Sequence, residues 1–138
     1  MKIMAIDYGD AHTGVAISDR TLTLTGFSTV ITAYRPEAVA QRVAELAREH
    51  GAEELVLGHP VNMDGTLGPR SEKAKAMKVL LEGATALPVV LWDERRTTID
   101  AHNILFNSGK NAKQRKKVVD AVAASLILEG YLTFKKSH

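Results

Sequence analysis

The order of the apolar segments constrains this fold most strongly, because three strand-like segments come first and helical and strand-like segments alternate after them. Residues 2–7 are mostly apolar, which is typical of a strand buried on both faces. Residues 13–18 and 21–32 are rich in Thr, Val and Ile and predict two more strands after a turn at residues 8–12. Because the connections are short, we expect these three strands to form an antiparallel meander.

Apolar residues then recur at helical spacing, beginning at Pro36, a favoured first helical residue, and stopping at Gly51. The patterns further along the chain predict two strands, 55–57 and 88–92, and three helices, 70–83, 97–106 and 118–132. We therefore expect an α/β fold with a five-stranded mixed sheet, made of the meander plus two parallel strands and flanked by helices. The length of 138 residues fits one domain, 1–138.

Composition excludes several classes of protein. The chain has no Cys, which excludes a disulfide framework, thiolate metal sites and a cysteine nucleophile. No apolar run approaches the roughly 18–20 residues that cross a bilayer, and no signal-peptide pattern opens the sequence. We expect a cytoplasmic protein with no membrane partner.

Positive charge is concentrated in one part of the chain. The formal net charge is only +2, but residues 95–120 hold seven Lys or Arg and two Asp. The basic segment includes a predicted loop at 110–117 that is rich in Lys. Such a segment on a near-neutral body is typical of a protein that binds a polyanion. A solvated lysine-rich loop is the alternative interpretation.

Three carboxylates occupy unusual positions. Asp7 ends the first apolar strand, Glu94 follows the strand at 88–92, and Asp120 is the only charged residue in an apolar stretch of the last helix. An isolated ionised carboxylate in apolar surroundings costs several kcal/mol, so each needs a partner or a metal ion. If all three share one strand-end cleft, their oxygen ligands suit Mg²⁺ or Mn²⁺.

Each acid also has a structural interpretation. Asp7 could cap the following turn, Glu94 could pair with Arg95 or Arg96, and Asp120 could be the N-cap of the last helix. Any one of these alternatives is reasonable alone, whereas three such acids on separate elements favour a shared site.

Two loops could bind phosphate. Gly9 follows the first strand, and a tight glycine turn lets backbone amides approach an anion, although ordinary turn chemistry is the alternative. The polar loop 62–70 precedes a helix whose N-terminus could hold an anion together with Arg70. Thr97 and Thr98 could contact phosphate or cap a helix.

Taken together, the motifs resemble the YqgF family (also called RuvX), which comprises Holliday junction resolvases and pre-16S ribosomal RNA nucleases. The resemblance covers essentially the whole chain. It rests on Asp7-x-Gly9 with Gly14-Val15-Ala16, Asn62 to Thr66 with Gly68-Pro69-Arg70, Asp93-Glu94-Arg95 with Thr97-Thr98, and Lys117 to Ala121 with Ala123-Ala124.

The resemblance implies a ribonuclease H-like fold and an acidic triad of Asp7, Glu94 and Asp120. It implies a hydrolase of ester bonds with a two-metal-ion mechanism. In that mechanism Asp7 bridges two Mg²⁺ or Mn²⁺ ions, and Glu94 and Asp120 hold one ion each. The residues expected to bind substrate are Gly9, His12, Asn62, Asp64, Gly65, Thr66, Arg70, Arg95, Thr97, Thr98, Lys113, Lys116 and Lys117.

Two positions depart from the family pattern. Ala11-His12 stands where the family usually has a Lys-Arg pair, and His59 stands where it usually has Leu between Gly and Pro. His12 could contact phosphate weakly or be solvated. His59 could line the cleft or fill a core position. These changes bear on substrate binding rather than on catalysis.

The function that the resemblance implies is metal-dependent hydrolysis of nucleic acid in ribosome biogenesis, at the 5′ end of pre-16S rRNA. A Holliday junction resolvase acting on branched DNA and a non-catalytic nucleic-acid or ribosome-associated factor are the alternatives. A phosphotransferase or ATPase of the actin and sugar-kinase type shares the Asp-x-Gly hairpin but normally needs two such domains. The sequence leaves RNA or DNA, and monomer or homodimer, open.

Overall fold

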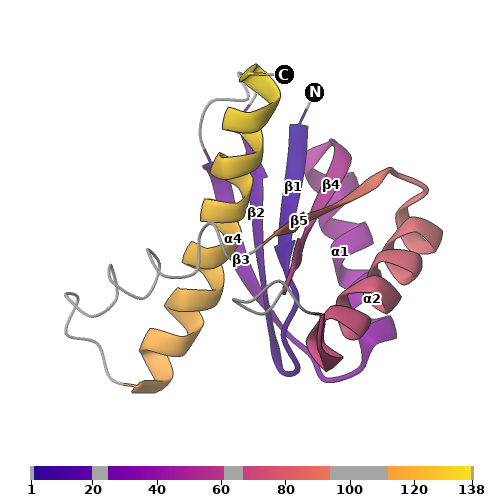
Figure 1. Ribbon diagram of the computed structural model, residues 1–138, viewed down its shortest axis with the longest axis vertical. Helices are drawn as coiled ribbons and strands as arrows, with labels where there is room; N and C mark the ends of the chain where they lie inside the picture. The colour runs from indigo at the N-terminus through magenta and orange to yellow at the C-terminus, as the bar shows by residue number, and fades with distance from the viewer. Residues whose placement is uncertain (1, 20–24, 61–66, 94–111, 138) are drawn as a thin grey trace.

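The computed structural model describes residues 2–19, 25–60, 67–93 and 112–137. Within them the strands are β1 (Lys2–Asp7), β2 (His12–Ser18), β3 (Thr25–Thr32), β4 (Ala52–His59) and β5 (Val89–Asp93). They form a five-stranded sheet in the order β3-β2-β1-β4-β5 (Figure 1). The β1–β2 and β2–β3 pairs are antiparallel, whereas β1–β4 and β4–β5 are parallel. The predicted meander with two added parallel strands is confirmed.

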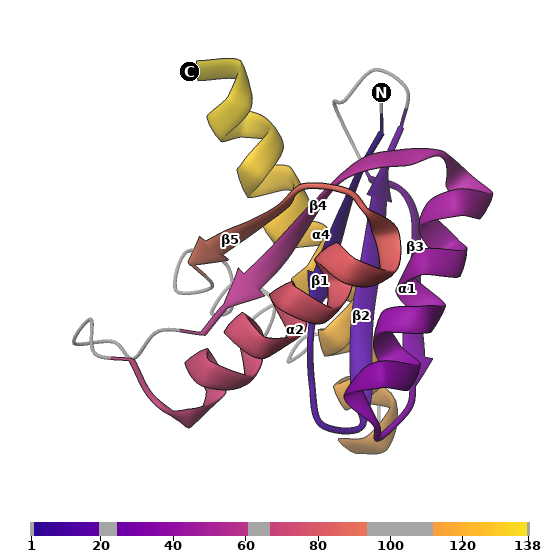
Figure 2. The ribbon, with the colours of Figure 1, turned by 90° about the vertical axis from the view of Figure 1, so that its right-hand side faces the viewer.

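Helices cover both faces of the sheet. The described helices are α1 (Pro36–His50), α2 (Pro69–Thr85) and α4 (Ala112–Ser137). Figures 1 and 2 show α1 and α2 together on one face and α4 on the other. The predicted limits of α1 are confirmed, since Pro36 opens it and Gly51 ends it with a left-handed φ of 72°.

The two faces of the central strands bury separate apolar clusters. Met4 and Ile6 pack toward α1 and α2 with residues such as Val43. Ile3 and Ala5 alternate with them and pack toward α4. Because both faces of β1 are covered, its apolar sequence does not alternate with polar residues. This arrangement confirms the expected doubly buried strand.

Several predicted limits were wrong. α4 begins at Ala112, so residues 112–117 are helical and the predicted basic loop does not extend through them. The physical reason is that residues 112–117 contain no Gly or Pro and consist of good helix formers, so their charge does not prevent helix formation. β4 is longer than the predicted strand 55–57, because its polar amino end pairs with its neighbour too. The predicted helix 97–106 lies outside the described residues.

Candidate active site

The parallel strands bring acidic residues to one edge of the sheet. β1 ends at Asp7 and β5 ends at Asp93, and β4 lies between them. Ile6 pairs with Leu57, and His59, two residues further along β4, pairs with Asp93. The carboxyl ends of these strands therefore share the edge where open α/β sheets bind ligands.

Asp7 lies on the face of the sheet that α4 covers. Side chains alternate along a strand, so Asp7 shares its face with Ile3 and Ala5, both packed against α4. Tyr8 follows on the opposite side and packs with the α1 and α2 cluster. Asp7 is half-buried and lies opposite Gly14 of β2. Asp7 thus lies at the carboxyl end of the central strand of the sheet, which is flanked by β2 and β4.

The helix that carries Asp120 runs antiparallel to β1 and β4 (Figure 1). Near its end, the Tyr131 hydroxyl donates a hydrogen bond to Glu54, close to the amino end of β4. Asp120 lies 11 residues earlier, about 16 Å along a helix axis. The five steps along the strand from Glu54 to His59 span about the same length. The backbone of α4 at Asp120 is therefore level with the carboxyl ends of the strands.

The alternative in which Asp120 caps the last helix is wrong. α4 begins at Ala112, so Asp120 lies two turns inside it. The side chains of Asp120, Lys113, Lys116 and Lys117 are not described. The predicted site residues that lie outside the described residues are Asn62, Asp64, Gly65, Thr66, Glu94, Arg95, Thr97 and Thr98.

Because Glu94 and the side chain of Asp120 are not described, the fit of a metal ion depends on the donors that can be identified. Among the described side chains there is no group of three His, Cys, Asp or Glu residues that could hold one. Asp7 is a half-buried carboxylate at the strand edge, and the other two predicted ligands are carboxylates as well. Such an all-oxygen donor set fits a hard divalent cation.

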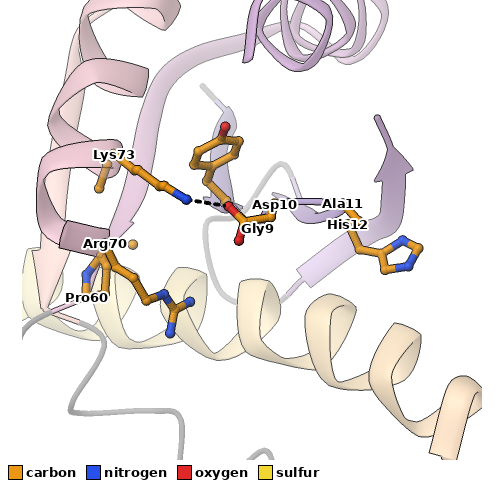
Figure 3. Close-up of a pocket in the computed structure, with 10 residues that line it drawn as sticks. Gly9, Asp10, Ala11, His12, Pro60, Arg70 and Lys73 are labelled. Atoms are coloured by element: carbon orange, nitrogen blue, oxygen red, sulfur yellow. Dashed lines mark hydrogen bonds and ion pairs between the residues drawn. The ribbon is translucent and has the colours of Figure 1, made fainter. Parts of the chain in front are cut away.

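A pocket of about 250 Å³ opens next to the carboxyl end of β1, on the side of the sheet that α2 covers. The turn between β1 and β2 forms one wall, and the start of α2 forms another (Figure 3). Its lining residues are Tyr8, Gly9, Asp10, Ala11, His12, Gly58, Pro60, Arg70, Lys73 and Ala74. The structure thus brings together three predicted substrate-binding residues, Gly9, His12 and Arg70, from segments about 60 residues apart in the sequence.

The turn at Gly9 requires a glycine. A Cβ atom at this position would collide with the backbone carbonyl of His12. The Gly9 amide donates a long hydrogen bond of 3.5 Å to the Thr13 hydroxyl within the same turn. The glycine therefore serves the tight hairpin that forms one wall of the pocket.

The two histidines have different surroundings. His12 lies 3.4 Å from the Thr32 hydroxyl through Nδ1, and its ring points away from Arg70 and Lys73 (Figure 3). His59 is half-buried, and its Nε2 lies 2.6 Å from the hydroxyl of the fully buried Ser71. His59 thus links the end of β4 to α2, and it is not among the residues that line the pocket.

Sequence reasoning missed the three other residues of this pocket with ionisable side chains, Tyr8, Asp10 and Lys73. Lys73 Nζ lies 2.9 Å from Asp10 Oδ1. Burial and, secondarily, the nearby carboxylate of Asp10 raise the pKa of Tyr8, so its phenol stays neutral at physiological pH. The signal for Lys73 was its spacing: it lies three residues after Arg70 and so on the same face of α2.

The fold belongs to the ribonuclease H-like class. RuvC of T. thermophilus, solved in complex with a Holliday junction substrate, superposes with a TM-score of 0.62 at 15% sequence identity. The match covers 99% of this chain and 96% of RuvC. At this identity the likeness concerns the fold alone. None of the described helices is long and apolar enough to cross a lipid bilayer.

The chain belongs to the family whose model is described as "RuvX: Holliday junction resolvase", which matches residues 1–134. A relative from Pelotomaculum thermopropionicum, named "Putative pre-16S rRNA nuclease", is 43% identical over 96% of this chain and 86% of its own length. A relative of the same name from Halothermothrix orenii is 42% identical over 98% of this chain and 96% of its own length. The resemblance inferred from the sequence motifs is confirmed.

Proposed function

We propose that this protein is a metal-dependent nuclease that hydrolyses phosphodiester bonds during maturation of the pre-16S rRNA 5′ end. The observation that carries the proposal is the position of Asp7, a half-buried carboxylate at the carboxyl end of a central strand. A pocket that contains Arg70 and Lys73 opens at the same strand end, on the α2 side. The names of the curated relatives support rRNA as the substrate. We expect the protein to act in the cytoplasm, as a monomer or a homodimer.

In this proposal Asp7, Glu94 and Asp120 would hold the Mg²⁺ or Mn²⁺ ions. Such ions supply an activated water nucleophile and stabilise the charge that develops on the leaving oxygen. The role of the carboxylates would be to hold the ions in fixed positions. The rigid elements that carry Asp7 and Asp120, the covered central strand β1 and the long helix α4, favour this role. The expected products carry 5′-phosphate and 3′-hydroxyl ends.

The remaining predicted residues bind the strand. Arg70, Arg95 and the lysines at 113, 116 and 117 neutralise backbone phosphates, so affinity should fall steeply as salt rises. The loop residues Asn62, Asp64, Gly65 and Thr66, together with Gly9, His12, Thr97 and Thr98, supply hydrogen bonds that position the strand without reading its sequence.

Cleavage of Holliday junctions is the second candidate. The description of the family model favours it, and a symmetric junction would require two copies of the chain acting together. A non-catalytic role in nucleic-acid or ribosome binding is the remaining alternative. Such a role would use the same basic residues and would need no metal ion.

The test is a cleavage assay with purified protein on a 5′-extended 16S precursor RNA and on a four-way DNA junction, with Mg²⁺, Mn²⁺ or EDTA. We expect cation-dependent cleavage of the RNA. Asp7→Asn should reduce the rate about 10³-fold, because a loss of several kcal/mol of charge stabilisation corresponds to that factor.

Glu53→Gln is the matched control, since Glu53 is an exposed carboxylate near the opposite end of β4. It should cleave at the wild-type rate. Full activity of Asp7→Asn would exclude the proposed metal site, and cation-independent binding without cleavage of either substrate would favour the non-catalytic role.

A further inference from the structure

The pocket at the carboxyl end of β1 carries two cations from one face of α2. Arg70 and Lys73 lie three residues apart, both are exposed, and both line the pocket. In Figure 3 their side chains extend from the first turns of the helix on the side of the β1–β2 turn. Among the described residues, Arg70 has no carboxylate within ion-pair distance.

The backbone of α2 adds to the positive potential. The helix begins after Gly68, which as a glycine has no side chain that could cap the amides of the first turn. Arg70 is the second residue of this 17-residue helix and Lys73 the fifth. The positive end of the helix dipole therefore lies beside the two cationic side chains, and the three together favour an anion.

The pocket already holds one anionic group, the carboxylate of Asp10. Its ion pair with Lys73 joins two side chains that are 82% and 56% exposed. Exposed pairs of this kind contribute little to stability, because water solvates both partners and salt screens them. Lys73 can therefore exchange Asp10 for another anion at small cost.

We propose that this pocket binds a phosphate group through Arg70 and Lys73, and that Asp10 competes with that phosphate for Lys73. The inference rests on the proposed function in one respect, namely that the phosphate belongs to the backbone of a nucleic-acid strand. Because Asp7 faces α4 and the pocket lies on the α2 side, this phosphate flanks the cleaved one. Lys73 is then a substrate-positioning residue, and Asp10 weakens the binding of any strand that does not displace it.

The test measures binding without cleavage. A fluorescein-labelled 12-nucleotide single-stranded RNA is titrated by anisotropy in EDTA over a range of KCl concentrations. Lys73→Gln should weaken binding about 5- to 10-fold at low salt, and it should reduce the slope of log affinity against log salt by about 0.7, the value for one phosphate contact to a single strand.

Lys75→Gln is the matched control. Lys75 lies on the same helix, pairs with Glu72 at 3.8 Å and does not line the pocket. The Lys75→Gln substitution removes the same charge as Lys73→Gln and should change the affinity for RNA less than 2-fold. Equal losses in the two variants would overturn the proposal, because they would mean that only the general charge of α2 matters.

The role of Asp10 is tested by a double-mutant cycle. Asp10→Asn should strengthen RNA binding about 3- to 5-fold when Lys73 is present and should have less than 2-fold effect in the Lys73→Gln background. An equal gain in both backgrounds would contradict competition for Lys73.

A second arm distinguishes a strand phosphate from a free one. Titration calorimetry with ATP and with inorganic phosphate should detect only weak binding, in the millimolar range. Micromolar ATP binding that requires Lys73, combined with RNA binding that does not, would overturn the assignment to nucleic acid. If the wild type binds RNA through Lys73 but cleaves neither substrate, the proposed function fails and this inference stands. If the wild type cleaves, but the Lys73→Gln and Lys75→Gln variants bind RNA with equal affinity, the proposed function stands and this inference fails.

Discussion

Two ion pairs of nearly equal length lie near opposite ends of the sheet and have very different surroundings. Lys73 Nζ lies 2.9 Å from Asp10 across the pocket, and Lys135 Nζ lies 2.8 Å from Glu54 near the amino end of β4. The Asp10 side chain is 82% exposed, whereas that of Glu54 is 13% exposed. The same contact can therefore be available to a ligand in one region and part of the packing in the other.

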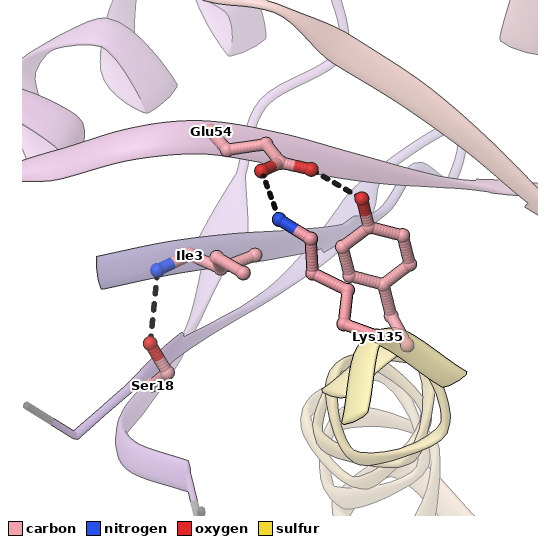
Figure 4. A network of polar contacts seen from close by, with 5 residues as sticks. Ile3, Ser18, Glu54 and Lys135 are labelled. Atoms are coloured by element: carbon pink, nitrogen blue, oxygen red, sulfur yellow. Dashed lines mark hydrogen bonds and ion pairs between the residues drawn. The ribbon is translucent and has the colours of Figure 1, made fainter. Parts of the chain in front are cut away.

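The pair at the amino end belongs to a network. The Tyr131 hydroxyl donates a hydrogen bond to one oxygen of Glu54, and Lys135 donates to the other (Figure 4). Lys135 also lies 5.6 Å from the centre of the Tyr131 ring, and that ring packs edge-on against Trp92. A largely buried carboxylate needs such partners, because its desolvation is costly without them. Burial, and not distance, therefore separates a structural ion pair from an exchangeable one.

Of the substitutions that test this difference between the two ion pairs, Glu54→Ala should have the largest effect on stability. This change leaves Tyr131 and Lys135 without their acceptor and should lower the free energy of unfolding by about 2–3 kcal/mol, the range for hydrogen bonds to charged groups. Urea denaturation measures it. Glu53→Ala, at the exposed neighbour in β4, controls for strand propensity and should cost less than about 1 kcal/mol. Equal losses would remove the distinction between the two ends.

A smaller loss of stability, about 1.5 kcal/mol at pH 7, is expected for Tyr131→Phe, which removes one hydrogen bond to a carboxylate and leaves Lys135 as the partner of Glu54. Burial first, and the Glu54 hydrogen bond and charge next, raise the pKa of Tyr131. The unfolded phenol ionises near pH 10 while the folded one stays protonated, so this contribution is present below about pH 10 and is lost as pH rises above it.

Urea denaturation between pH 8 and 11 tests the alkaline part of that prediction. Wild-type stability should fall above about pH 10, and the fall should be shallower in Tyr131→Phe. Tyr34→Phe is the control, because Tyr34 is exposed, and it should leave the alkaline slope of the wild type unchanged. A slope unchanged by Tyr131→Phe would mean that other groups carry the alkaline transition.

The smallest effect on the free energy of unfolding is expected for substitutions at the pocket. Asp10→Asn and Lys73→Gln should each change the free energy of unfolding by less than about 0.5 kcal/mol, because an exposed ion pair contributes little. The same urea experiment measures it. A loss above about 1.5 kcal/mol in either variant would place this pair with Glu54 and Lys135 as a structural contact.

Much of the fold was predictable because its signals are local. The limits of β1 and α1 follow from an apolar run, from Pro36 and from Gly51, none of which needs information from distant residues. The start of α4 was predicted wrongly, since lysine-rich residues at 112–117 were interpreted as a loop. A helix can carry such charges on an exposed side, so charge alone does not mark the end of a helix.

The candidate site was predictable in part. The acidic residues stood out because carboxylates are costly in apolar surroundings. Gly9, His12 and Arg70 line the same pocket, although the His12 ring points away from Arg70 (Figure 3). Asp10 and Lys73 did not stand out, because each is an ordinary charged residue in a polar neighbourhood of the sequence. Their relation depends on a contact across 63 positions, which no local pattern reports.

Period and spacing along the chain determined the type and order of the strands and helices, and with them the mixed sheet, because backbone hydrogen bonding and burial impose those periods directly. Only the tertiary structure decided which charges meet and how much water reaches them. It buried Glu54 under the end of α4 and left Asp10 in solvent opposite Lys73. Burial sets the strength and the exchangeability of an ion pair, and burial is a property of the packed molecule rather than of the order of its residues.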